Sequence, residues 1–152
     1  MSQSESGSKE HKSVNQSAIL IAGDLLVLLS FVWIGRSSHS LSITDIGAGL
    51  FTALPFIIGW FAVTPWFGLY RQDACQNWRK LVPRLLIAVV IAILVSATLR
   101  ALFLGRPIPG GIMPTFTLIA LSYIGLVTLV WRLGYIWWIN RRKDKRLEGA
   151  EL

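Results

Sequence analysis

The chain has 152 residues, of which 53% are hydrophobic and only 15% are charged, and its formal net charge is +7. In soluble domains about a quarter of the residues are charged, so this composition excludes an ordinary soluble globular domain. One cysteine and two histidines exclude a disulfide framework and a zinc site built only from these residue types. The cationic residues lie between long apolar runs, which is typical of a membrane protein and argues against nucleic-acid binding.

Four apolar segments follow a polar beginning. Residues 1–17 are rich in Ser, Gln, Glu and Lys, which predicts a disordered tail. The apolar segments lie at about 18–34, 46–64, 81–104 and 112–139, each close to the roughly 20 residues that a helix needs to cross a bilayer. Such segments must be helical, because hydrocarbon offers no partner for backbone polar groups. We therefore expect one all-α domain over residues 18–139, a bundle of four transmembrane helices, followed by a basic tail at 140–152.

The second apolar segment contains a proline. Pro55 has no N–H, so it frees a carbonyl one turn earlier and predicts a kink in the helix. Gly59 lies one turn further along and predicts a close approach by a neighbouring helix. Such kinks are common in membrane helices, and a structural role explains them.

Lys and Arg residues outside the spans predict how the helices are oriented. Eleven of them lie in the two tails, in the loop after the second segment and at the start of the third helix, whereas the other two loops hold only Arg36 and Arg106. Both termini are therefore expected in the cytoplasm, and the membrane is expected to be the inner or plasma membrane of the cell. Aromatic residues gather at the predicted cytoplasmic interface as anchors; they are Trp66, Tyr70, Trp78, Tyr135, Trp137 and Trp138.

Two opposite charges lie at similar depth in the first and last segments. Asp24 is about 9 Å and Arg132 about 10 Å from the predicted cytoplasmic ends of their helices, at the rise of an α-helix. Ionisable groups at this depth are costly and usually face the inside of a bundle, so we predict an Asp24–Arg132 pair. The pair is interpreted either as a structural contact that fixes helix register or as a gated, proton-linked pair on a transport path.

Basic residues also gather near the other ends of the helices. Arg36, His39, Arg100 and Arg106 are close enough along the predicted topology to converge, with Asp45 the one acidic residue nearby. Guanidinium groups match carboxylate and phosphate oxygens, so the cluster is a candidate anion pocket. The alternative is that Arg36 and Arg106 contact lipid phosphates and the last carbonyls of their helices.

Several short motifs resemble those of one membrane protein family. They are Gly23-Asp24, the stretch Phe31 to His39, Pro55-Phe56 with Gly59-Trp60, Thr98-Leu99-Arg100, Pro114-Thr115-Phe116 and Trp131-Arg132. Together they resemble the uncharacterised family catalogued as domain of unknown function 3054, over roughly residues 18–139. The resemblance implies four membrane helices and no particular activity, and it places the family's characteristic polar residues at Asp24, Arg36, His39, Arg100 and Arg132.

Two hypotheses of function stay open. The first is a noncatalytic accessory or scaffold protein that packs, within the lipid bilayer, against another membrane protein or a second copy of itself. Small residues that admit a partner helix favour it; they are Gly47, Gly49, Ala53 and Gly59. The second is a small oligomeric transporter or channel that passes an anion or a proton along Asp24, Arg100 and Arg132. The sequence has no metalloprotease motif and no Gly-rich phosphate loop, so we expect no enzyme, metal or cofactor.

Overall fold

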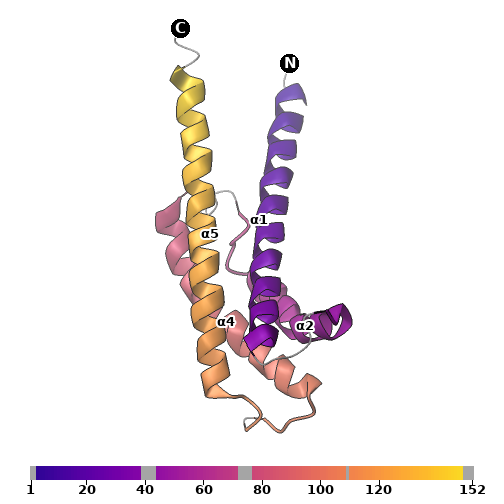
Figure 1. Cartoon of the computed structure of the whole chain (residues 1–152). Helices are drawn as coiled ribbons and strands as arrows, with labels where there is room; N and C mark the ends of the chain where they lie inside the picture. Colours follow the sequence, from indigo (N-terminus) through magenta and orange to yellow (C-terminus); the bar gives the residue numbers. More distant parts are fainter. Residues whose placement is uncertain (1–2, 39–43, 72–76, 109, 149–152) are drawn as a thin grey trace.

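The computed structural model describes residues 3–38, 44–71, 77–108 and 110–148. Over these residues the chain is helical, without a strand, and its helices are α1 (Gln3–Ser38), α2 (Ile46–Val63), α4 (Trp78–Phe103) and α5 (Pro114–Glu148) (Figure 1). Each helix contains a segment long and apolar enough to cross a membrane; these segments are Gln16–Ser38, Ile46–Val63, Trp78–Phe103 and Pro114–Arg142. The all-α architecture and the four candidate spans are confirmed.

The structure differs from the predicted boundaries at both ends of the chain. α1 begins at Gln3, inside the segment predicted to be a disordered tail, and α5 continues to Glu148 in the basic tail. Extending an existing helix costs much less than starting one, and neither extension contains a proline. The tails therefore continue the helices of the first and last spans.

The helices form a ring in which each one packs against two neighbours. The main contacts join α1 to α2, α2 to α4, α4 to α5, and α5 back to α1. α1 and α5 run side by side, and the start of α1 and the end of α5 lie at the same end of the bundle (Figure 1). We call this end the termini end, and the end where α1 stops and α5 starts the opposite end.

The closest helix contact is between α2 and α4, and it depends on Gly59. A Cβ atom at Gly59 would lie 2.2 Å from Oγ and 2.9 Å from the backbone N of Ser96. Only a glycine permits this approach, so the predicted close contact at Gly59 is confirmed. α2 continues as a helix across Pro55, which is buried within the bundle. The kink at Pro55 stays a prediction.

Three of the four small residues of α2 are buried within the chain, whereas Gly47 is exposed and a Cβ there would meet only Asp45. Gly49 faces the ring of Trp33 on α1, whose nearest atom would be 3.3 Å from an added Cβ. Ala53 is fully buried, and Gly59 faces α4 as described above. The expectation that this row receives a helix of another protein is therefore wrong for these positions, because α1 and α4 already cover them.

Apolar side chains fill the middle of the ring and separate its two ends. Leu28 of α1 and Ile124 of α5 are almost completely buried there. Towards the opposite end the ring of Phe31 lies 5.4 Å from that of Phe56 and 5.9 Å from that of Phe116, measured between centroids. Polar groups beyond this layer at one end are thus isolated from those at the other.

Candidate functional sites at the two ends of the bundle

A buried ion pair joins the first helix to the last near the middle of both helices, on the termini side of the apolar layer. Arg132 Nη2 lies 2.5 Å from Asp24 Oδ2, and Arg132 Nε donates to Asp24 Oδ1 over 3.3 Å. Both residues are only 1% exposed. This two-point contact is the geometry in which a guanidinium and a carboxylate bind each other most strongly. The structure thus brings the two predicted partners together.

Further groups complete the hydrogen bonding of this pair. Asp24 Oδ2 also accepts from Tyr70 OH at 2.9 Å and from Trp60 Nε1 at 3.2 Å. Arg132 Nη1 donates to the backbone carbonyl of Leu69 over 2.6 Å. Thr64 Oγ1 donates to the carbonyl of Trp60 over 2.8 Å and lies 3.4 Å from Tyr70 OH. We call this set the polar network; it consists of Asp24, Trp60, Thr64, the Leu69 carbonyl, Tyr70 and Arg132.

A tight turn after α2 brings two members of the network inward. Gly68 has φ of +63°, a conformation that L side chains rarely adopt. Its N–H donates to the carbonyl of Pro65 over 2.9 Å, and the N–H of Leu69 donates to the carbonyl of Thr64 over 3.4 Å. The chain therefore folds back at Gly68, which places the Leu69 carbonyl and the Tyr70 hydroxyl beside the ion pair.

The surroundings of the network favour the neutral form of Tyr70. Burial raises the pKa of the Tyr70 phenol above its usual value of about 10, and the negative charge of Asp24 raises it further. The Arg132 guanidinium also lies over the Tyr70 ring, 5.1 Å from its centroid. At neutral pH Tyr70 is thus a fixed hydrogen-bond donor to Asp24.

The packing around the polar network holds no space for a water molecule beside Arg132. The gap beside Arg132, lined also by Leu20 and Tyr135, has a volume of about 0 Å³ for a water molecule. Five hydrogen bonds to named partners already occupy Asp24 and Arg132. Because a buried charge is stabilised only when it is fully paired, this geometry suits a structural contact between helices.

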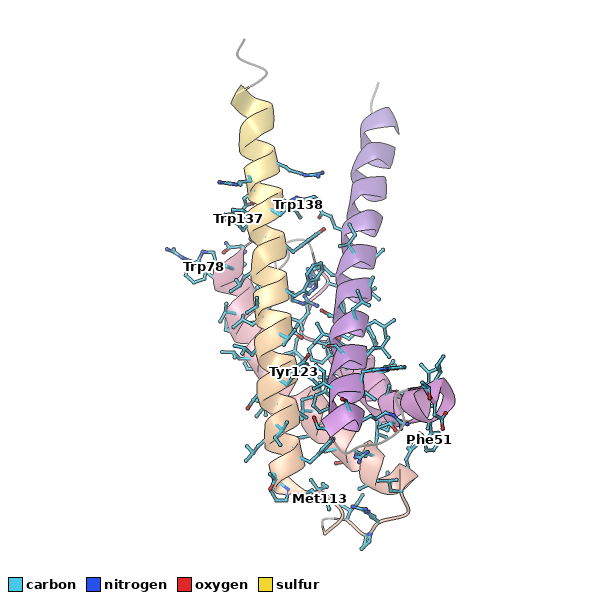
Figure 2. All side chains as sticks on the ribbon, viewed as in Figure 1. Phe51, Trp78, Met113, Tyr123, Trp137 and Trp138 are labelled. Carbon is cyan, nitrogen blue, oxygen red and sulfur yellow. The ribbon has the colours of Figure 1, made fainter. Side chains whose placement is uncertain are left out.

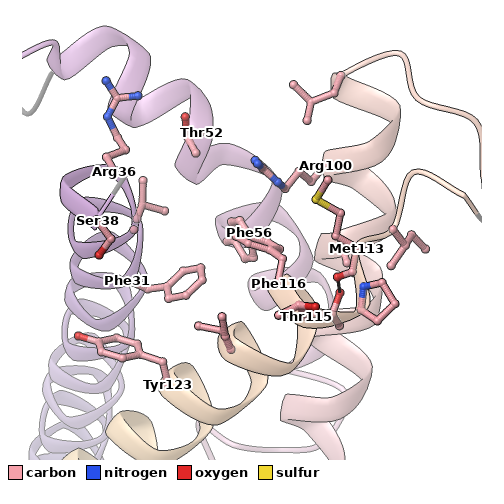
Figure 3. Close-up of a pocket in the computed structure, with 18 of the residues that line it drawn as sticks. Phe31, Arg36, Ser38, Thr52, Phe56, Arg100, Met113, Thr115, Phe116 and Tyr123 are labelled. Carbon is pink, nitrogen blue, oxygen red and sulfur yellow. Dashed lines mark hydrogen bonds between the residues drawn. The ribbon is translucent and has the colours of Figure 1, made fainter. Parts of the chain in front are cut away.

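A cavity of about 670 Å³ lies at the opposite end, between α1, α2, α4 and the start of α5 (Figure 3). Arg36, Arg100 and Arg106 line it, so the structure brings three of the four predicted basic residues to one cavity. His39 lies outside the described residues. The rest of the lining is mainly apolar, and the Arg100 guanidinium lies over the Phe116 ring, 4.7 Å from its centroid. We call this cavity the arginine pocket.

Arg100 is far from the polar network. The pocket includes Arg36, which follows Asp24 by about 18 Å along α1 at the helical rise, and neither Asp24 nor Arg132 lines the pocket. The predicted transport cluster of Asp24, Arg100 and Arg132 is therefore not formed. Its charges lie on opposite sides of the apolar layer.

The predicted anchor tryptophans are exposed near the termini end. Trp66 is 88% exposed, and Figure 2 shows Trp78, Trp137 and Trp138 at similar levels along the bundle. Guanidinium groups lie over three of these rings, at 5.5 Å for Arg79 on Trp78, 4.5 Å for Arg141 on Trp137 and 3.8 Å for Arg142 on Trp138. Such mixed aromatic and cationic surfaces suit a membrane interface.

Two predicted anchors have other positions. Tyr135 is only 6% exposed and packs with Leu20 and Ile139, and Tyr70 points into the polar network. Sequence reasoning also missed Trp60, whose indole N–H binds Asp24. For Tyr70, the available signal was the Pro65-to-Gly68 turn directly before it, because such a turn reverses the chain.

A profile described as "Protein of unknown function (DUF3054)" matches residues 21–135. The chain belongs to the DUF3054 family. The match begins before Asp24 and ends after Arg132, so it includes the polar network and the arginine pocket. No curated protein and no solved structure matches the chain. Family membership and the four apolar helices together indicate a membrane protein of unknown activity.

Proposed function

We propose that this protein is a noncatalytic accessory or scaffold subunit of the cell membrane that packs against another membrane protein or a second copy of itself. The observation that carries the proposal is the saturation of the polar network. Its buried charges are used to hold α1, α5 and the turn after α2 together. A bundle whose intramembrane charges are committed to its own structure acts through its surfaces.

α5 offers the largest free surface for a partner. It is the least buried of the four spans, and Leu126 and Val130 on its outward side are 64% and 63% exposed. Association in a membrane depends on shape and close packing, because lipid chains are as apolar as leucine. We therefore place the partner on this side of α5.

Cysteine cross-linking tests the proposed contact. In a Cys75→Ser background, Leu126→Cys or Val130→Cys in native membranes should give one discrete cross-linked product with a bis-maleimide. Ala120→Cys is the matched control, because Ala120 is on α5 but is completely buried. A monodisperse single chain after mild extraction, with no cross-linked product from either exposed position, would contradict a scaffold role.

The proposed orientation places both termini in the cytoplasm. The positions of the helix ends support it, since the two tails lie at the same end of the bundle as the exposed Trp–Arg pairs. Membrane-impermeant maleimide should label Ser38→Cys from outside the cell, in a chain that lacks Cys75. The native Cys75 should be labelled only after the membrane is opened, and the reverse pattern would overturn the orientation.

A small oligomeric transporter is the second candidate, and the arginine pocket favours it. A cavity with several guanidinium groups is a plausible entry site for an anion. In liposomes that contain the purified protein, a transporter should release chloride or phosphate, and Arg100→Gln should slow the release. Release equal to that of empty liposomes would remove this candidate.

A further inference from the structure

We propose that the arginine pocket is a binding site for an amphipathic anion, a carboxylate or phosphate head group that carries an apolar chain. The head group lies among Arg36, Arg100 and Arg106, and the chain extends inward between α1 and α5. This inference is independent of the scaffold role, because the pocket lies at the opposite end from the polar network and does not include the outward side of α5 at Leu126 and Val130.

The shape of the pocket fits an elongated ligand. Its volume of about 670 Å³ lies within the range of about 300–1,000 Å³ that is usual for small-molecule sites. The lining extends along the start of α5 from Pro114 to Tyr123, a distance of about 13.5 Å at the helical rise. Tyr123 is at the inner limit, where its hydroxyl lies 3.2 Å from Ser30 Oγ and its ring 5.7 Å from that of Phe31. The pocket therefore runs along the start of α5 as far as the Tyr123–Ser30 contact.

The walls of the pocket are apolar and aromatic. Phe31, Phe56 and Phe116 contribute rings from three different helices, as Figure 3 shows. The hydroxyls that line the pocket are largely used by the helices themselves, since Thr52 Oγ1 donates to the Ala48 carbonyl over 2.8 Å and Ser38 Oγ to the Ile34 carbonyl over 2.9 Å. Apolar surface with few free polar groups selects a hydrocarbon chain over a sugar or a peptide.

The charged residues that line the pocket are cationic. Among the described residues that line it, three are arginines and none is acidic. Arg100 and Arg106 line the same cavity, so their like charges repel each other there. The nearby carboxylate of Asp45 accepts from the Ala48 N–H at the start of α2, over 2.9 Å. An anionic head group relieves the repulsion and gives both guanidiniums a hydrogen-bond acceptor.

The start of α5 adds a second attraction for the head group. Pro114, Thr115 and Phe116 form the first turn of this helix, and all of them line the pocket. The N-terminal end of a helix carries a partial positive charge from its aligned peptide dipoles. This N-terminal end of α5 directly follows Met113, which also lines the pocket. Figure 3 shows the Arg100 side chain reaching into the same cavity. The positive groups are thus concentrated at the mouth and the apolar groups along the walls.

Dodecyl phosphate is the probe for this site. We expect native mass spectrometry of the full chain in a nonionic detergent to show one bound dodecyl phosphate per chain. Dodecyltrimethylammonium, with the same chain and the opposite charge, and inorganic phosphate, with no chain, should each bind at least about tenfold more weakly, because each lacks one half of the interaction.

Variants of the arginines test the head-group end. Arg100→Gln and Arg106→Gln should each weaken dodecyl phosphate binding by about tenfold, as expected for the loss of one charge-assisted hydrogen bond. Arg79→Gln is the matched control, because Arg79 is an arginine near the termini end, paired with Trp78. It should leave binding unchanged.

A substitution that fills part of the arginine pocket tests whether the hydrocarbon chain of the ligand binds there. Gly35 lines the pocket, and a Cβ there meets nothing within 4 Å, so Gly35→Leu adds apolar bulk at the pocket where a side chain has space. Binding of dodecyl phosphate should fall by about tenfold or more, since the chain loses its space. The control is Gly134→Leu, because a Cβ at Gly134 on α5 also meets nothing within 4 Å and Gly134 does not line the pocket.

The outcomes also identify the source of the ligand. An acidic lipid that co-purifies with the wild type and is missing from Arg100→Gln makes the ligand a component of the membrane. Dodecyl phosphate binding without any co-purified lipid makes it a soluble amphiphile, and both results support the site. The proposal is overturned if inorganic phosphate binds as tightly as dodecyl phosphate, if Arg100→Gln and Gly35→Leu bind like the wild type, or if no probe binds.

Discussion

The two ends of the bundle contain arginines in opposite situations. On the termini side of the apolar layer, Arg132 is 1% exposed and has a carboxylate and a carbonyl as partners. At the opposite end, Arg100 lines an open cavity and lies over an aromatic ring. The first arginine is part of the structure of the bundle, whereas the second is available to a ligand. If the arginine pocket binds a ligand as proposed, burial and pairing, rather than residue type, separate structural from functional charge in this membrane protein.

The largest effect is expected from breaking the ion pair. Asp24→Asn leaves the Arg132 guanidinium buried without a counter-charge, which typically costs about 3–5 kcal/mol. We expect loss of the folded peak in size-exclusion chromatography after mild heating. Replacing both residues, as Asp24→Leu with Arg132→Met, should cost less than Asp24→Asn alone, because neither charge is then left buried.

Exchange of the two charges should not rescue the fold. An acid at position 132 would face the Leu69 carbonyl, and a base at position 24 would face the N–H of Trp60 and the hydroxyl of Tyr70. The donors and acceptors of the polar network therefore fit an acid at position 24 and a base at position 132, and not the reverse. Wild-type heat resistance in Asp24→Arg with Arg132→Asp would contradict the arrangement of donors and acceptors described here.

Substitutions at two glycines of α1 compare the packing around the polar network with that around the arginine pocket. A Cβ at Gly23 would lie 2.2 Å from the indole of Trp131, whereas a Cβ at Gly35 meets nothing within 4 Å. Gly23→Ala should destabilise the bundle by about 1–3 kcal/mol through overpacking. Gly35→Ala should be neutral or stabilise it by up to about 1 kcal/mol, because alanine is the better helix former. Equal midpoints of thermal unfolding for the two variants would show that the ends are packed alike.

Removing the Tyr70 hydroxyl tests how much the turn after α2 contributes to the polar network. Tyr70→Phe removes the hydrogen bond to Asp24 and should cost about 1 kcal/mol at pH 8. The pKa of Tyr70 is raised in the folded state, so unfolded chains lose this proton first and stability falls as the pH rises above about 10. The gap between wild type and Tyr70→Phe should therefore narrow from pH 8 to pH 11. A constant gap in thermal unfolding would place the hydroxyl outside the buried network.

The smallest effect is expected at the arginine pocket. Arg100→Gln removes a cation that lies over Phe116 and should change the free energy of unfolding by less than about 1 kcal/mol. The wild-type elution profile and heat resistance should persist. A loss as large as that of Asp24→Asn would show that Arg100 is also a structural residue, and the contrast between the two ends would disappear.

Much of the fold could be predicted because membrane helices have few alternatives. Length and apolar content located the four spans, and the matched depths of Asp24 and Arg132 indicated their pairing. Gly59 indicated the close approach of α2 and α4. Each of these predictions concerns a single helix or the depth of a residue in the membrane. The depth follows from the rise per residue of an α-helix.

The turn after α2 and the cavity depend on three-dimensional packing. Tyr70 follows an exposed tryptophan and was expected at the interface, but the positive φ of Gly68 directs the chain inward. The basic residues near the opposite end were visible in the sequence, whereas the cavity between them depends on how α1, α4 and α5 diverge. The polar composition of the tails predicts disorder, whereas each tail continues the helix of the neighbouring span.

The pairing of Asp24 with Arg132 also constrains how the protein is made. Its partners are 108 residues apart, so during synthesis the acid of the first span enters the membrane long before its base exists. A lone aspartate in a bilayer costs at least about 2.5–3.5 kcal/mol. The last helix therefore completes the first, and a nascent or truncated chain without α5 carries an aspartate that lacks its counter-charge within the membrane.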